Sequence, residues 1–130
     1  MKTKPNIQIL DRDFTIHRMH PDENLPAEIL QNDFYWIGKT DEELSIICET
    51  SIKLKSMKSD SGWIAFKLIG PFDFSEIGII SGITKVLADA LIGIFAVSTY
   101  DTDYILVKKK NIEKAVDALR ENGYSVEPEL

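Results

Sequence analysis

Hydrophobic residues recur at helical spacing in two parts of the chain. Within residues 75–92 they form one broad face, and this predicts an amphipathic helix that lies on a sheet; its members are Ile79, Ile80, Ile83, Val86, Leu87, Ala90 and Leu91. We expect Gly93 to end this helix at the C′ position. Residues 112–119 repeat the spacing i, i+3, i+4, i+7, with Asn111 as the expected N-cap and Gly123 after the helix.

Short apolar or alternating runs predict the strands. They occupy residues 7–10, 14–19, 34–39, 44–48, 63–69, 94–99, 104–108 and 124–127. Four polar residues join the runs 34–39 and 44–48, which favours a hairpin. Pro21 and Pro26 leave room for only a short helical turn around Ala27–Leu30. Residues 50–61, rich in Ser and Lys, are the best candidate for a domain boundary.

The order of elements predicts an α+β fold. Residues 62–127 spell β-α-β-β-α-β, the ferredoxin-like arrangement, which predicts an antiparallel four-stranded sheet with both helices on one face. The first half repeats part of this order, because a shift of sixty positions lays Ile37 on Val97 and Asp41 on Asp101. We therefore expect a degenerate N-terminal unit, residues 1–61, and a complete C-terminal unit, residues 62–130. The N-terminal copy would have lost most of its first helix and lack a clear second one.

Composition narrows the class of protein. The 130 residues are 44% hydrophobic and 28% charged, as in an ordinary globular protein. The net charge of −6 argues against a nucleic-acid partner, and the predicted strand 104–108 lacks the paired exposed aromatics of an RNA-binding sheet. The sequence has no long uncharged apolar run of the kind that spans a membrane. Cys48 is the single cysteine, so it cannot form an internal disulfide. These features favour a soluble protein of the reducing cytoplasm.

Catalytic and metal-binding patterns are weak. His17 and His20 are three residues apart on or near a predicted strand, so they should face opposite sides. Cys48 lies in an apolar run and is expected to be an inert core thiol. The sequence contains no Gly-x-Ser-x-Gly, Walker-type or dinucleotide-binding motif. We expect no catalysis, no metal and no cofactor.

A glycine-rich turn, Gly70 to Gly78, precedes the long helix. Asp73 and Glu76 have the spacing of a capping box, and the remaining amides at the helix start favour a carboxylate or phosphate. Gly78 has no side chain to keep such a ligand away. A capped helix start that binds only water is the alternative. Gly78 and Gly82 share a helix face, which a ligand, another domain or close packing on the helix's own sheet would each explain.

Two stretches resemble a known family. They are Gly70-Pro71-Phe72-Asp73-Phe74-Ser75 followed by Gly78-Ile79, and the run Phe95 to Val107 with its Ser-Thr-Tyr-Asp-Thr-Asp segment. Both are similar to tandem ACT-domain proteins related to aspartate-kinase regulatory domains and CASTOR-type amino-acid sensors. The similarity extends over nearly the whole chain, more loosely in the N-terminal half.

The resemblance implies a β-α-β-β-α-β module that binds amino acids or other small metabolites at domain interfaces. It places the ligand against the glycine-rich turn and beside the strand that begins at Phe95. The candidate ligand-binding residues are Gly70, Phe74, Ser75, Glu76, Ile77, Gly78, Phe95, Ser98, Thr99, Asp101 and Asp103. Amides around Ser75, Glu76 and Ile77 would hold an α-carboxylate, and Glu76, Asp101 and Asp103 are candidate partners of an α-ammonium.

Structural explanations stand beside these roles. Asp101 and Asp103 are also typical hairpin-turn residues, Glu76 could serve the capping box alone, and Phe95 and Tyr100 could belong to the core. The resulting hypothesis is a non-catalytic, amino-acid-binding regulatory protein that forms a homodimer and acts on an unidentified protein. The alternative is a protein–protein interaction module, joined through a sheet edge or helix face, without a small ligand.

Overall fold

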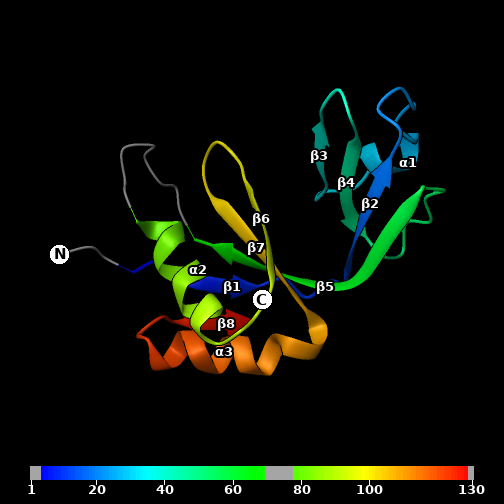
Figure 1. Cartoon of the computed structure of the whole chain (residues 1–130). Coiled ribbons are helices and arrows are strands. Elements are labelled where there is room, and N and C mark those ends of the chain that lie inside the picture. Colours follow the sequence, from blue (N-terminus) through cyan, green and yellow to red (C-terminus); the bar gives the residue numbers. More distant parts are fainter. Residues whose placement is uncertain (1–3, 70–77, 129–130) are drawn as a thin grey trace. The chain divides into compact units, whose positions relative to one another are not determined.

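The computed structural model describes residues 4–69 and 78–128, and the chain divides into two compact units (Figure 1). Unit 1 consists of Met1–Asp11 and Ile64–Leu130, and unit 2 of Arg12–Trp63. The chain therefore begins in unit 1, forms unit 2 and returns to unit 1. The division predicted from composition, between residues 61 and 62, falls inside strand β5 (Lys58–Leu68), which runs from unit 2 into unit 1.

In the part of unit 1 that the structure describes, five strands form the sheet, in the order β6-β7-β5-β1-β8. Besides the second half of β5 they are β1 (Ile7–Ile9), β6 (Ile94–Ser98), β7 (Asp103–Lys108) and β8 (Val126–Pro128). The N-terminal strand β1 pairs antiparallel with β5 and parallel with β8. The first strand of the chain thus completes the C-terminal sheet, a long-range pairing that its short apolar run did not reveal.

Two helices pack on one face of this sheet, α2 (Ile79–Asp89) and α3 (Ile112–Glu121). The 3-10 helix η1 (Lys109–Asn111) leads from β7 into α3. The hydrophobic stripes of both helices meet strand residues in one core, whose members include Ile7, Phe66, Leu68, Ile83, Leu87, Ile105, Val107, Ala115, Leu119 and Val126. The ferredoxin-type α+β fold predicted from the element order is confirmed.

The start of α2 differs from the prediction. Gly78 occupies the N-cap position with φ of 83°, so it precedes the first helical turn instead of belonging to it. The predicted capping residues Asp73 and Glu76 lie outside the described residues. Asn111 does stand at the N-cap of α3, but its side chain makes no capping hydrogen bond.

The end of α2 also differs. Leu91, not Gly93, takes the left-handed C′ position, with φ of 61°. The Leu91 amide donates to the Ala88 carbonyl at 2.9 Å and the Ile92 amide donates to the Leu87 carbonyl at 3.0 Å. These two bonds define a Schellman motif, and the buried side chains of Ile92 and Leu87 belong to the same core cluster.

Unit 2 is an antiparallel sheet with one short helix. Its strands β2 (Phe14–Met19), β3 (Trp36–Lys39), β4 (Leu44–Glu49) and the first part of β5 follow the order β3-β4-β2-β5. Helix α1 (Ala27–Leu30) places Ile29 in a core with Met19, Leu44, Ile46 and Cys48. The predicted strand at 14–19, the helical turn and the β3–β4 hairpin are confirmed.

The hairpins of the two units correspond closely, at an offset of fifty-nine positions instead of the expected sixty. Four residues separate Lys39 from Leu44 and Ser98 from Asp103, the last paired residues of each hairpin. The Thr40 amide donates to the Glu43 carbonyl at 2.9 Å, and the Thr99 amide to the Thr102 carbonyl at 2.8 Å. Side chains alternate between the two faces of a strand. An alignment of the two hairpins that is wrong by one residue therefore assigns every side chain to the opposite face.

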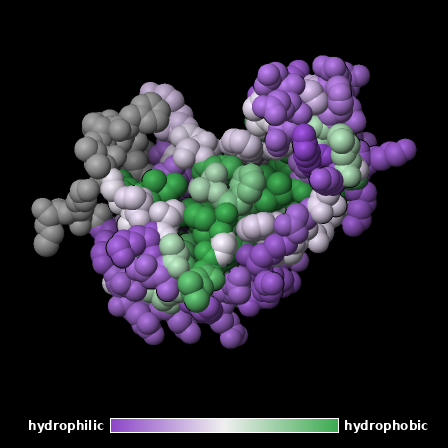
Figure 2. All heavy atoms as spheres, in the orientation of Figure 1, coloured by the Kyte–Doolittle hydropathy of each residue, from purple (hydrophilic) through white to green (hydrophobic). Residues whose placement is uncertain are grey.

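Figure 2 shows hydrophobic residues gathered over the strands of unit 1 on the face toward the viewer, with hydrophilic residues around them.

Among the described helices, none has the length and apolar character needed to cross a membrane.

Candidate functional site

The tip of the β6–β7 hairpin is tied to the end of β5. The Thr102 hydroxyl, in the loop between β6 and β7, donates a hydrogen bond to the carbonyl oxygen of Leu68, the last residue of β5. Thr102 is one of the few buried polar residues in the described chain. The segment predicted to flank the ligand begins at Phe95 and includes Thr102. This bond therefore fixes one part of that segment to the end of β5, the strand that precedes the glycine-rich turn in the sequence.

Three of the predicted ligand residues take part in the hairpin itself. The Ser98 hydroxyl donates to the Asp103 carboxylate. The Thr99 hydroxyl donates to the Thr102 carbonyl at 3.2 Å and accepts a hydrogen bond from the Thr102 amide at 3.3 Å. These bonds agree with the turn-building role considered for Asp103. Asp101 is exposed at the tip of the loop, and Phe95 is half-buried on β6.

The predicted anion-binding amides lie outside the described residues, as do Gly70, Phe74, Ser75, Glu76 and Ile77. Of the glycine-rich turn, the structure describes Gly78 alone, at the start of α2. Its left-handed φ explains the glycine, because other residues adopt this conformation at a cost. The assignment of the turn as a ligand site stays a prediction.

Gly82 has an internal explanation. A Cβ atom added to it would lie 2.8 Å from the hydroxyl oxygen of Tyr124, which follows α3 and is buried in the unit 1 core. Close packing within unit 1 therefore accounts for this glycine. Burial also raises the pKa of the Tyr124 hydroxyl.

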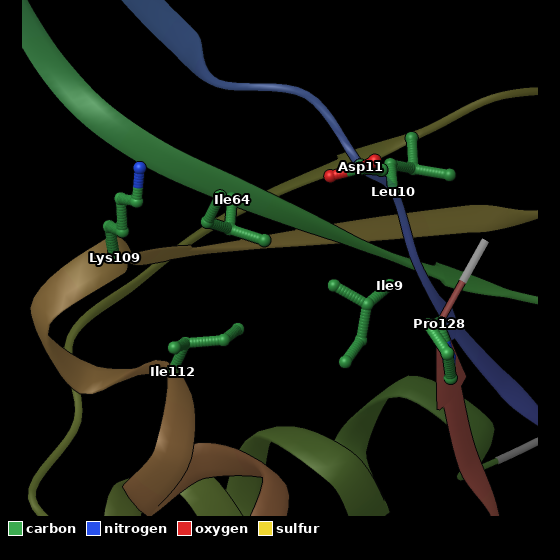
Figure 3. Close-up of a pocket in the computed structure, with 7 residues that line it drawn as sticks. All are labelled: Ile9, Leu10, Asp11, Ile64, Lys109, Ile112 and Pro128. Atoms are coloured by element: carbon green, nitrogen blue, oxygen red, sulfur yellow. The ribbon is translucent and has the colours of Figure 1, made fainter.

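A pocket of about 330 Å³ opens in unit 1 near the start of α3 (Figure 3). The side chains of Ile9 from β1, Ile64 from β5 and Ile112 from α3 point toward one another and form its apolar wall. Lys109 and Asp11 lie on opposite sides of Ile64 in this view. Leu10 and Pro128 complete the lining.

Sequence reasoning missed this pocket. Its residues come from the end of β1, the middle of β5, the start of α3 and the end of β8, so they meet only when β1 enters the C-terminal sheet. The one local signal was the run Lys108-Lys109-Lys110 at a helix start in an acidic chain. A second hollow, of about 490 Å³, shares Ile9 and Ile112 and continues along α3.

The histidines and the cysteine lie in structural settings. Burial lowers the pKa of His17, whose Nδ1 is 2.9 Å from the Ser56 hydroxyl and whose buried Nε2 has no hydrogen-bond partner. His20 is exposed. Burial, aided by the charge of Glu49, raises the pKa of the Cys48 thiol, which disfavours the reactive thiolate. Within residues 4–69 and 78–128, no three His, Cys, Asp or Glu side chains come together as metal ligands.

Comparisons with known proteins agree with the fold. An ACT-domain family model matches residues 58–121, and a model for the N-terminal domain of another protein group matches residues 12–52. The regulatory subunit of aspartate kinase from Thermus flavus is 10% identical, with 92% of this chain and 98% of that chain covered and a TM-score of 0.65. A structure of aspartokinase alpha and beta subunits is 16% identical, with 92% and 97% covered and a TM-score of 0.63. None of the curated proteins matches.

A closer likeness is the Agrobacterium tumefaciens protein Atu0741, whose crystal structure is known. The two chains are 36% identical over 99% of this chain and 96% of that one, with a TM-score of 0.90. The chain therefore belongs to the same family as Atu0741, and its residues 58–121 match the ACT-domain model.

Proposed function

We propose that this protein is a non-catalytic regulator that binds an amino acid through its ACT domain. The ligand would lie between the glycine-rich turn and the β6–β7 hairpin, and binding would change how the protein meets a second copy or a target protein. The ACT-domain match and the likeness to regulatory subunits of aspartate kinase support a regulatory role.

One observation carries the location. The hydrogen bond from the Thr102 hydroxyl to the Leu68 carbonyl joins one implicated segment, which runs from Phe95 to Asp103, to the end of β5, two residues before Gly70. The hairpin tip near this bond carries exposed polar groups, of which Asp101 is a suitable partner for an α-ammonium group. An α-carboxylate would bind the amides at the start of α2, where the helix dipole favours negative charge.

Thermal unfolding in the presence of each of the twenty common amino acids tests this proposal. A ligand at about a hundred times its Kd should stabilise the protein by roughly 2.7 kcal/mol. If none of the amino acids shifts the transition, the proposal is wrong and the interaction module without a small ligand becomes the better hypothesis. Sedimentation with and without the active amino acid then shows whether the protein dimerises.

Asp101→Asn is the informative variant for the location. It removes a charge from an exposed loop residue, so the fold should survive while the ligand-induced shift decreases. Asp41→Asn is the matched control, because Asp41 is an exposed aspartate in the corresponding four-residue loop of unit 2. Gly78→Leu is less suitable, since its φ of 83° strains any side chain irrespective of ligand. Equal shifts in both Asp variants would place the ligand elsewhere.

A further inference from the structure

We propose that the pocket beside α3 is a second small-molecule site, and that it takes an aliphatic amino acid or a similar zwitterion. The site consists of an apolar wall, Ile9, Ile64 and Ile112, with Lys109 and Asp11 at its rim (Figure 3). All of these residues belong to unit 1, and none of them belongs to the glycine-rich turn or to the β6–β7 hairpin. The two proposals therefore rest on different residues, and variants of those residues tell them apart.

The pocket has room for a small ligand. Its volume of about 330 Å³ is at the lower end of the range of known ligand sites, about 300 to 1,000 Å³. Three isoleucine side chains from different elements contribute the wall, so an aliphatic group would have apolar contacts in this partly open pocket. The apolar wall favours a branched hydrocarbon over a polar side chain.

The charged side chains at the rim indicate which polar groups the ligand should carry. Lys109 lies in η1, which leads directly into α3, so its positive charge is near the positive end of a ten-residue helix. The Asn111 side chain does not cap this helix. This side of the pocket suits a carboxylate.

Asp11 supplies the opposite charge. It ends the first segment of unit 1, after β1, and its carboxylate suits an ammonium group. Asp11 and Lys109 both already interact with other groups of the chain, so the ligand would share or replace those interactions. An apolar wall with one charge of each sign at the rim matches an aliphatic zwitterion better than a simple fatty acid or a simple amine.

Methyl NMR of the full-length protein provides the direct test. Isoleucine δ1 methyl groups are labelled, and L-leucine, L-isoleucine and L-valine are titrated separately. We expect saturable shifts of the Ile9, Ile64 and Ile112 signals. The Ile29 and Ile46 signals, from the core of unit 2, should stay in place. Absence of shifts at the three pocket methyls with all three amino acids overturns the proposal.

Analogues and variants test the two charges. 4-Methylpentanoate, which lacks the ammonium group of leucine, and 3-methylbutylamine, which lacks the carboxylate, should each bind at least about tenfold more weakly than leucine. Asp11→Asn and Lys109→Gln should each weaken leucine binding by a similar factor. Lys110→Gln is the matched control, because this neighbouring exposed lysine does not line the pocket. Equal affinity of leucine and 4-methylpentanoate overturns the assignment of a zwitterion.

The two proposed sites are distinguished by one comparison. Asp101→Asn should leave the leucine affinity read from Ile9, Ile64 and Ile112 unchanged, whereas Lys109→Gln should weaken it about tenfold. Leucine binding that is lost in Asp101→Asn and retained in Lys109→Gln would overturn the pocket proposal while supporting the site at the hairpin.

Discussion

Gly82 of α2 faces the hydroxyl group of Tyr124 so closely that a Cβ atom on Gly82 would lie 2.8 Å from the hydroxyl oxygen. Tyr124 is buried, and the Lys4 ammonium lies 5.0 Å from the centre of its ring. The glycine therefore allows α2 to approach the segment after α3. This contact leads to a double-mutant test.

Gly82→Ala should destabilise the protein by about 1 kcal/mol, because the clash with Tyr124 outweighs the better helix propensity of alanine. In a Tyr124→Phe background the hydroxyl is absent, and the same substitution should instead stabilise by roughly 0.5 to 1 kcal/mol. Urea unfolding of the four proteins measures the coupling. An effect of equal size and sign in both backgrounds would show that the hydroxyl does not determine the glycine.

Leu91 offers a second test of backbone conformation. It takes the left-handed C′ position of α2 although its side chain is 87% exposed. Leu91→Gly should stabilise by about 0.5 to 1 kcal/mol, because glycine adopts this conformation without strain. Leu91→Ala should be nearly neutral, since alanine retains the strain and the lost side chain makes little contact. A large loss in the alanine variant would instead reveal a contact of the leucine side chain.

His17 makes stability depend on pH. Burial lowers its pKa in the folded protein below the ordinary value of 6.5, so the unfolded chain binds the proton more readily. Stability should therefore be fully present above about pH 6.5 and decrease as the pH falls from there toward the lower pKa of the folded state. Urea unfolding across this range should show a weaker pH dependence for His17→Gln. The exposed His20→Gln is the control, and an unchanged slope in His17→Gln would contradict the assignment.

Local patterns predicted the local elements well. Strand β2, helix α1 and the β3–β4 hairpin follow from alternation, two prolines and a polar four-residue loop, all of which act over a few residues. The α2–α3 face of the unit 1 core likewise follows from helical spacing. Such features need no knowledge of distant partners.

Features that depend on distant segments escaped prediction. The pairing of β1 with β5 and β8 joins residues far apart in sequence, and its three residues carry no mark of their partners. The pocket followed from that pairing and was missed with it. The end of α2 was also predicted incorrectly, because Leu91 and not Gly93 takes the left-handed C′ position. The Schellman hydrogen bonds and the burial of Ile92 determine where the helix ends, although a glycine lies nearby. The glycine-rich turn stays a sequence-based prediction.

The discontinuity of unit 1 makes unit 2 an insertion that protein engineering could excise. Strands β1 and β5 are antiparallel neighbours, and the Leu10 amide donates to the Ala65 carbonyl at 2.9 Å, so Asp11 and Ile64 stand at one end of a ladder. An Asn-Gly turn replacing residues 12–63 should close them into a hairpin. If unit 1 folds without unit 2, the shortened protein should unfold in one cooperative transition. If unit 1 depends on unit 2 for its stability, the shortened protein should fail to fold.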